Sequence, residues 1–254
     1  MVTTPYSRRF YARCADASAQ SATRIVPHVM RLLGPRSVVD VGCGLGAWLA
    51  AFTAEGVQTI MGIDGEHVDR EALRIPAERF HAHDLEQPLE LGGDPPQRFE
   101  LAMSLEVAEH LPERCAAAFV ESLARLAPVV LFSAAVPRQG GTRHLNEQWP
   151  QYWARQFARH GFETVDCIRP FIWDDPDVAY YYAQNMLCFV ETAALAERAT
   201  LQQYVVPADG ALARIHPRKW LEATDHRHRA LGDIVRSLPW AVRNTLARWW
   251  EKAA

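Results

Sequence analysis

Residues 38–46 are Val38-Val39-Asp40-Val41-Gly42-Cys43-Gly44-Leu45-Gly46, a β-branched run followed by three closely spaced glycines. β-Branched residues favour a short buried strand, and glycines permit a tight turn and the close approach of a ligand to the backbone. The next residues, 47–54, have a helical pattern. The sequence therefore predicts a strand, a glycine loop and a helix, with a ligand at the loop.

The same alternation of strands and helices continues outward from this unit. Further strands are expected at 59–63, 80–84, 100–105 and 129–133, and helices at 21–33 and 114–127. Such spacing predicts an α/β fold with a doubly wound, mostly parallel sheet of seven strands. The last two strands, 163–169 and 185–191, are joined by a long loop without a normal helical crossover, and they are expected to form an antiparallel edge pair.

Charge and composition divide the chain into a body and a tail. Residues 195–254 carry ten Lys/Arg against six Asp/Glu, whereas the remaining residues carry seventeen against twenty-four. We expect one domain over residues 1–194 with a helical N-terminal lid, and a basic helical C-terminal extension over residues 195–254. An acidic body is a poor partner for a polyanion, so nucleic acid is not expected as a ligand.

The five cysteines are scattered singly without a CxxC pair. This argues against a disulfide framework or a zinc site, and for a reducing compartment. No apolar run is long enough to span a membrane, and the N-terminus has no apolar signal-peptide core. The expected location is the cytoplasm.

Two acidic residues stand behind the glycine loop. Asp64 ends the second strand, eighteen residues after Gly46, where a carboxylate can accept the hydroxyls of a ribose. Asp84 ends the third strand, where it can meet an adenine edge. The spacing GxGxG differs from the GxGxxG of nicotinamide-dependent oxidoreductases, which argues against that class.

Residues 37–191 resemble the class I S-adenosylmethionine-dependent methyltransferases. The glycine stretch resembles the first motif of that family, Asp64 its ribose-binding acid, and Asp84-Leu85 its adenine-binding pair. Residues 101–111, LAMSLEVAEHL, resemble the segment that flanks the methionine and sulfonium part of the cofactor. The resemblance implies S-adenosylmethionine as cofactor, held by Asp40, Gly42, Cys43, Gly44, Gly46, Asp64, Asp84, Leu85, Ser104, Leu105 and Glu106.

Three of the residues in these motifs have a second interpretation. Asp40 either ties down the loop through backbone N–H groups or lies near the methionine part of the cofactor. Cys43 is expected to be a small residue in a tight place and not a nucleophile. Glu109 is expected to be a solvated helix residue and not a ligand.

Two histidines are candidates for a catalytic base. His144 lies in the polar loop after the fifth strand, where ligand crevices form, although Asn146 there is also placed to cap the following helix. His110 lies beside the cofactor segment, with a structural contact as the alternative. Neither these histidines nor the pair that flanks Asp84 has neighbouring residues that would complete a convincing set of metal ligands, so no metal is expected.

Polar and aromatic residues at 173–185 are expected to form a wall of the substrate site, with core packing as the alternative for some tyrosines. The N-terminal aromatic residues either cover the site or fray. Gln20 and Ser21 are placed to approach the cofactor carboxylate. The substrate-binding candidates are Tyr11, Asn146, Trp149, Tyr181, Gln184 and Asn185.

The absence of several signatures narrows the reaction. Residues 104–107 are Ser-Leu-Glu-Val, not Asn-Pro-Pro-Tyr or Asp-Pro-Pro-Tyr, and no Pro-Cys nucleophile is present. What remains resembles the small-molecule branch, which includes methyltransferases of sugar and glycan biosynthesis. We expect O-methylation of a sugar, glycan or related polyhydroxyl metabolite with a histidine base. N- or C-methylation of a small metabolite and a non-catalytic cofactor-binding module are the alternatives.

The tail from residue 238 onward combines Trp240, Trp249 and Trp250 with basic residues. A helix here would carry an apolar stripe, which fits weak contact with an anionic membrane surface. The alternative is packing on the body or on a second subunit of a homodimer.

Overall fold

The structure is a computed structural model of the 254-residue chain. It describes residues 8–92, 97–207, 209–225 and 235–245, with side chains from residue 17 onward. The chain divides into two compact units, Met1–Arg214 and Ile215–Ala254. Among the described residues, no helix combines the length and apolar character needed to cross a membrane.

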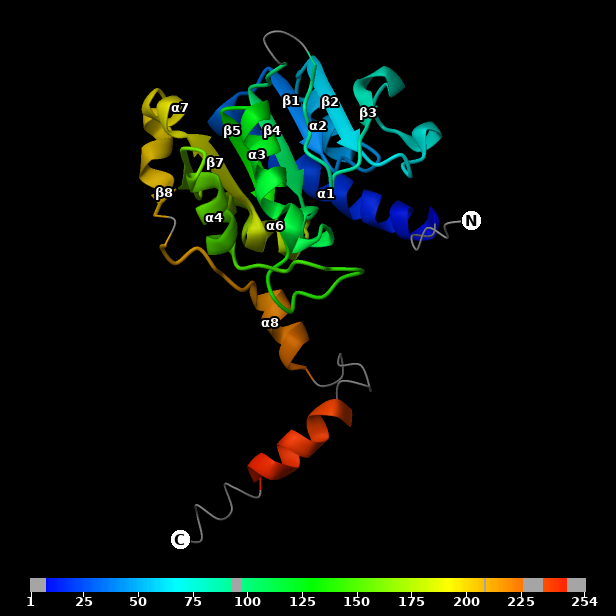
Figure 1. Ribbon diagram of the computed structural model, residues 1–254, viewed down its shortest axis with the longest axis vertical. Helices are drawn as coiled ribbons and strands as arrows, with labels where there is room; N and C mark the ends of the chain where they lie inside the picture. The colour runs from blue at the N-terminus through cyan, green and yellow to red at the C-terminus, as the bar shows by residue number, and fades with distance from the viewer. Residues whose placement is uncertain (1–7, 93–96, 208, 226–234, 246–254) are drawn as a thin grey trace. The chain divides into compact units, whose positions relative to one another are not determined.

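The first unit contains an eight-stranded sheet in the order β3-β2-β1-β4-β5-β7-β6-β8 (Figure 1). Its strands are β1 (Ser37–Val41), β2 (Thr59–Asp64), β3 (Phe80–Ala82), β4 (Leu101–Leu105), β5 (Val129–Ser133), β6 (Phe162–Val165), β7 (Leu187–Glu191) and β8 (Val205–Val206). The first five are parallel to one another, and β7 pairs antiparallel with both β5 and β6. The α/β class, the parallel body and the antiparallel pair are confirmed.

The predicted number of seven strands is wrong by one. Strand β8 consists of two residues, and it pairs antiparallel with β6 so that Val165 lies opposite Val205. Two residues are too short a run to show an alternating pattern in the sequence.

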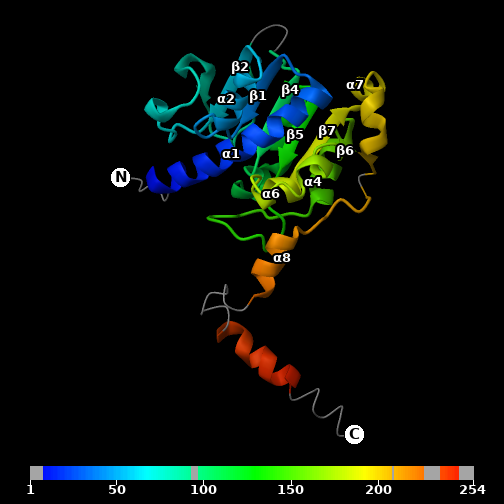
Figure 2. The same cartoon turned by 180° about the vertical axis from the view of Figure 1, so that it is seen from behind.

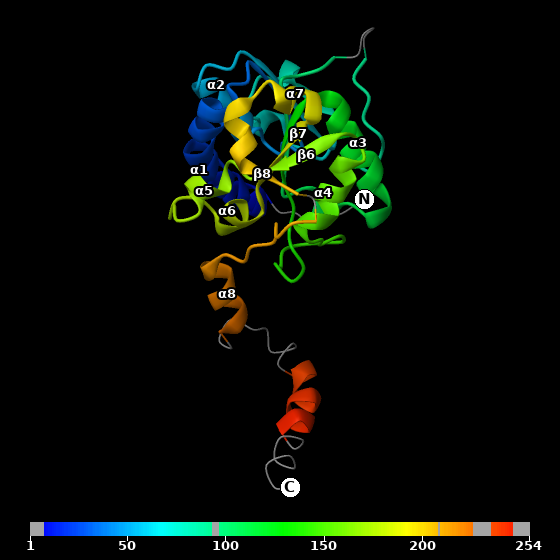
Figure 3. The same ribbon diagram turned by 90° about the vertical axis from the view of Figure 1, so that its left-hand side faces the viewer.

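The sheet lies between two layers of helices (Figures 1–3). One face is covered by α1 (Arg8–Leu33), α2 (Ala47–Ala54), α5 (Arg169–Ile172) and α6 (Tyr180–Asn185), and the other by α3 (Ala116–Leu126) and α4 (Pro150–Ala158). Side chains alternate across the strands, so Val129 and Leu131 join the first core cluster, and Val130 and Phe132 join the second.

The compact unit extends beyond the domain boundary expected at residue 194. Helix α7 (Thr192–Ala196) and the 3-10 turn Ala199–Tyr204 lead into β8, and Leu201 and Leu212 are completely buried. The Arg214 guanidinium also pairs with buried Asp166 at 2.9 Å. Residues 195–214 are therefore part of the sheet unit and not of an extension.

The N-terminal helix α1 is fastened to the segment that precedes α6. Arg24 donates to Asp175 at 2.8 Å, Gln20 donates to Asp177 at 3.0 Å, and Ser21 accepts from the Ala179 backbone at 3.0 Å. Gln20 and Ser21 are therefore engaged with this segment, and their approach to the cofactor stays a prediction. Tyr6 lies outside the described residues, as do the side chains of Phe10 and Tyr11.

The second unit contains α8 (Pro217–Thr224) and a helical stretch over residues 235–245. Trp220, Leu221, Trp240 and Val242 are exposed, each by more than half of its surface. The stripe expected in the tail is described only up to residue 245, and Trp249 and Trp250 lie outside the described residues. Contact with a membrane or a second subunit stays a prediction.

Candidate active site

The glycine loop follows β1 at the point where the sheet order reverses between β2 and β4. The backbone N–H groups of Gly42 and Cys43 donate to the Ile63 carbonyl at 2.7 and 3.2 Å, which fastens the loop to β2. A Cβ at Gly42 would lie 2.3 Å from Val107 Cγ2, whereas a Cβ at Gly44 would meet nothing within 4 Å. The loop is therefore packed at Gly42 and open at Gly44, as a site for a ligand beside the backbone requires.

The carboxylate of Asp64 organises the loop from the end of β2. It accepts from the backbone N–H of Gly44 and of Gly65, both at 2.7 Å. Burial raises the pKa of this carboxyl, and the two N–H groups partly oppose that shift. Beside it, a cleft of about 530 Å³ is lined by Gly65, Glu66, His67, Ala82, His83 and Asp84. The two acids expected to bind ribose and adenine thus lie at or beside one cleft.

Two buried oxygens, one directly before the loop and one on β4, have no hydrogen-bond partner among the described residues. Asp40 Oδ2 is one, and Ser104 Oγ at the end of β4 is the other. Burial and the neighbouring Asp64 raise the pKa of the Asp40 carboxyl well above its ordinary value. Buried polar atoms normally have partners, so these two indicate a bound group that the protein chain alone does not supply.

The remaining cofactor candidates have mainly structural positions. Gly46 caps α2 in the left-handed conformation, Leu105 is buried in the first core cluster, and half-buried Leu85 packs against the second. Cys43 is buried with Sγ against the Gly62 backbone, and burial raises the pKa of its thiol, so the expectation of a small packed residue is confirmed. The open loop, the two acids and the unpaired oxygens together fit S-adenosylmethionine.

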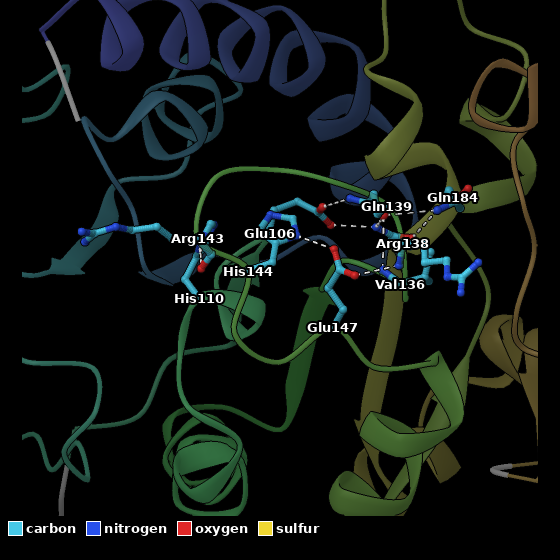
Figure 4. A network of polar contacts seen from close by, with 10 residues as sticks. Glu106, His110, Val136, Arg138, Gln139, Arg143, His144, Glu147 and Gln184 are labelled. Carbon is cyan, nitrogen blue, oxygen red and sulfur yellow. Dashed lines mark hydrogen bonds and ion pairs between the residues drawn. The ribbon is translucent and has the colours of Figure 1, made fainter. Parts of the chain in front are cut away.

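Glu106 forms the centre of a polar network directly after β4 (Figure 4). Gln139 donates to its Oε2 at 2.8 Å, and Asn185 donates to its Oε1 at 3.1 Å. Its backbone has a positive φ of 56°, an uncommon conformation for a residue other than glycine that often marks a functional position. Burial raises the pKa of the Glu106 carboxyl, and the amide donors oppose this.

The two candidate histidines meet on one side of Glu106 (Figure 4). Their rings lie 5.0 Å apart in an edge-to-face arrangement. His144 Nδ1 bonds to Glu147 at 2.8 Å, and Glu147 also accepts from the Arg138 backbone at 2.7 Å. His110 Nδ1 lies 3.4 Å from the Arg143 carbonyl. The structure therefore brings together the two residues that the sequence nominated separately.

Glu109 is the largest departure from expectation. It is completely buried in the 3-10 turn Ala108–His110, so the expectation of a solvated residue is wrong. Its carboxylate lies beside His110 and His144, and one ligand atom from each of the three residues lies within 4.8 Å of the others. The expectation that these histidines lack a third metal-ligating neighbour is therefore also wrong.

Asn146 does not cap the helix that follows it. The cap position of α4 belongs to Trp149, and Asn146 is buried, with its backbone N–H donating to the Glu109 carbonyl at 3.0 Å. Its Nδ2 has no hydrogen-bond partner among the residues that the structure describes. Asn146 therefore helps to fix the turn that carries Glu109 and offers a spare donor.

The expected substrate wall is only partly at the surface. Trp149 is 45% exposed, and Tyr181 is half-buried against the ring of Tyr182. Gln184 and Asn185 are buried, and their amides donate to Gln139 and Glu106. In this structure these two residues position Glu106, and they do not present their amides to a substrate.

Sequence reasoning gave no role to Gln139 or Glu147. Gln139 links three side chains of the Glu106 network, and Glu147 orients His144. For Glu147 a signal was present, because an acid three residues after a histidine in a loop can reach its ring. Nothing local in the sequence pointed to Gln139, whose partners come from distant segments.

A family model described as "Methyltransferase domain" matches residues 9–166. The chain therefore belongs to the methyltransferase-domain family. Its doubly wound sheet and glycine loop are those of a class I methyltransferase domain.

Several curated relatives are ubiquinone biosynthesis O-methyltransferases. The one from Rhodopseudomonas palustris strain TIE-1 is 33% identical over 109 residues, which cover 40% of this chain and 42% of the relative. That shared region is thus about two-fifths of the relative's length. The one from strain BisB18 is 30% identical over 210 residues, covering 76% of this chain and 74% of that relative.

Solved structures share the fold at low identity. Magnesium protoporphyrin IX methyltransferase from Synechocystis PCC 6803, with bound SAH, has a TM-score of 0.52 and 19% identity, over 74% of this chain and 90% of that chain. The sugar N-methyltransferase KedS8 from Streptoalloteichus sp ATCC 53650 has a TM-score of 0.53 and 16% identity, over 75% and 97%. These likenesses concern the fold alone.

Proposed function

We propose that this chain methylates a hydroxyl oxygen of a small polyhydroxyl molecule, such as a sugar or a glycan unit. The observation that carries the proposal is the hydrogen bond between His144 and Glu147 at 2.8 Å. A carboxylate that holds a histidine ring in one orientation is the usual support of a general base. A hydroxyl acceptor must lose a proton, which such a group helps to remove, whereas a neutral amine can react by positioning alone.

The reaction requires the acceptor oxygen, the methyl carbon and the sulfur in line, with the reacting atoms about 3 Å apart. When bound, S-adenosylmethionine supplies a methyl group activated by its sulfonium sulfur. The acceptor oxygen would take the methyl group from this sulfur, which would keep the electron pair of the broken bond. His144 takes the hydroxyl proton, and Glu147 stabilises the resulting imidazolium.

Two further observations support a small oxygen acceptor. The curated relatives are named O-methyltransferases, which favours oxygen over nitrogen. The loop that carries His144 exposes Leu145 and Trp149, which can pack against the apolar faces of a sugar ring. The excess of acids outside the C-terminal sixty residues disfavours a nucleic acid acceptor.

The test is methyl transfer from labelled S-adenosylmethionine to a panel of sugars and glycans, with phenols and amines alongside. We expect label on the sugar or glycan acceptors. Transfer only to phenols would show that the acceptor is a phenol and not a sugar or glycan. Transfer only to amines would favour N-methylation. Cofactor binding without transfer to any compound would favour a non-catalytic module.

Variants of the histidine pair test the role of the base. His144→Ala should bind S-adenosylmethionine normally and lose turnover by about 10²–10⁴-fold. His81→Ala is the matched control, because His81 is an exposed histidine on β3. Equal turnover of the His144→Ala variant and the unmodified chain would remove His144 from the mechanism.

A further inference from the structure

Glu109, His110 and His144 form a compact cluster at the carboxyl ends of β4 and β5. The first two lie in the turn after β4, and the third lies in the loop after β5. One possible donor atom from each lies within 4.8 Å of the others. Bonds of about 2 Å to one ion place ligand atoms about 3–4 Å apart, so side-chain movements of about 1 Å would complete a site.

The Nδ1 atom of each histidine ring already has a hydrogen-bonding partner. His144 Nδ1 bonds to a Glu147 carboxylate oxygen, and His110 Nδ1 faces the Arg143 carbonyl. Both acceptors can only accept, so each Nδ1 carries a hydrogen, and in a neutral ring the lone pair is then on Nε2. Metal-binding histidines are commonly held in this way, with the outer N–H on a carboxylate or a carbonyl.

Glu109 supplies an observation that a histidine base does not explain. Its side chain is completely buried, and neither carboxylate oxygen has a hydrogen-bond partner in the described part of the chain. The backbone N–H groups of Glu109 and Ala135 lie close enough to lower its pKa slightly, but burial and nearby Glu106 raise that pKa much more. A buried carboxyl without partners is costly whether it is ionised or protonated, because either form leaves polar atoms unpaired.

We propose that Glu109, His110 and His144 bind one divalent transition-metal ion beside the cofactor site. Two imidazole nitrogens and one carboxylate suit ions of the manganese-to-zinc series, whereas Mg²⁺ and Ca²⁺ prefer oxygen ligands. Three protein ligands leave positions open for an exogenous oxygen, as in catalytic sites. Glu106 is not assigned as a ligand, because amides already occupy both its oxygens.

The role of this ion rests on the proposed function. An acceptor hydroxyl bound to the ion has a lowered pKa and releases its proton to water before its oxygen attacks the methyl carbon. With the ion bound, His144 is a ligand through Nε2, and it acts as the base described above only in the metal-free chain. Glu147 keeps its place as the residue that orients the His144 ring.

Metal binding can be measured without any acceptor. The full chain, without a histidine tag and freed of metal by chelation, is titrated with Co²⁺ and followed by visible absorption, and with Zn²⁺ by calorimetry. We expect one ion per chain. Glu109→Gln, which keeps the shape of the side chain, and His110→Ala should each weaken binding by more than about tenfold, and Glu147→Gln by about 10–100-fold.

Two matched variants serve as controls. Glu113→Gln changes an exposed acid in the next turn, and His81→Ala changes an exposed histidine on β3. Both should bind Co²⁺ as the unmodified chain does. S-adenosylmethionine binding by every variant reports an intact fold, because that site uses other residues.

The outcomes separate the metal site from the proposed reaction. One Co²⁺ per chain that Glu109→Gln weakens supports the site, even when no hydroxyl compound is methylated. Absent Co²⁺ and Zn²⁺ binding, or binding that Glu109→Gln and His110→Ala leave unchanged, overturns the site. Hydroxyl methylation that survives chelation at full rate also overturns the role of the ion, while the O-methyltransferase assignment stands.

Discussion

Alanine substitutions at Gly42 and Gly44 should separate the stability of the glycine loop from its binding of the cofactor. Both glycines have positive φ, 87° at Gly42 and 53° at Gly44. An alanine in this region costs about 1–2 kcal/mol, and the reduced entropy of the unfolded chain returns about 0.4–1 kcal/mol. Gly44→Ala should therefore lower the free energy of unfolding by about 1 kcal/mol.

Gly42→Ala carries a second cost. Its new Cβ would lie 2.3 Å from Val107 Cγ2 and 2.7 Å from Cγ1. Overpacking of this kind costs about 1–3 kcal/mol, so the total is about 2–4 kcal/mol. For a domain of this size the melting temperature should fall by roughly 5–15 °C, against roughly 3 °C for Gly44→Ala.

Gly44→Ala should weaken cofactor binding more than Gly42→Ala does, although it destabilises the fold less. The Cβ of Gly44→Ala points into the open space where the loop meets its ligand. Calorimetry with S-adenosylmethionine should show a loss of affinity of at least about tenfold in a protein that is nearly as stable as the unmodified chain. Thermal unfolding and calorimetry of both variants are the two assays.

A third variant tests the physical cause. Val107→Ala in the Gly42→Ala background removes the atoms that the new Cβ would overlap, and it should restore about 1–3 kcal/mol in a double-mutant cycle. A steric clash with Val107 is refuted when Gly42→Ala costs no more stability than Gly44→Ala, or when Val107→Ala restores nothing.

Three further predictions concern other acidic residues. Asp166→Ala leaves the buried Arg169 guanidinium without its two carboxylate contacts at 2.8 and 2.7 Å, and denaturant unfolding should show a loss of about 3–5 kcal/mol. Arg214→Ala removes only the half-exposed partner of Asp166 and should cost less than about 1 kcal/mol, and equal losses would contradict this account. The raised pKa of Asp40 favours its protonated form in the folded state, so its contribution to stability falls as pH rises through that pKa. Asp40→Asn should therefore flatten the dependence of melting temperature on pH above the ordinary carboxyl range, and an unchanged slope would be contrary evidence. Asp64→Ala removes the acceptor beside Gly44 and should weaken S-adenosylmethionine binding by more than about 100-fold, whereas unchanged affinity would exclude Asp64 from the site.

The sequence was sufficient for features that depend on neighbouring residues. The β-branched run, the three glycines and the helical pattern at 47–54 predicted β1, the loop and α2 with their observed bounds. Asp64 was predicted at the end of the second strand, where β2 does end, and Asp84 at the end of the third, although β3 ends two residues earlier, at Ala82. Both lie at the same edge of the sheet because parallel strands bring their carboxyl ends together. These features are local, or they follow from a regular topology.

The tertiary structure alone determined the environment of the candidate catalytic groups. Glu106 is held by Gln139 and Asn185, which lie 33 and 79 residues away in the chain. Glu109 is polar and looked solvated, yet it is buried beside two histidines from different loops. Burial, hydrogen-bond partners and pKa shifts depend on which distant segments come into contact. The periodicity of a single segment does not show which distant segments it will contact.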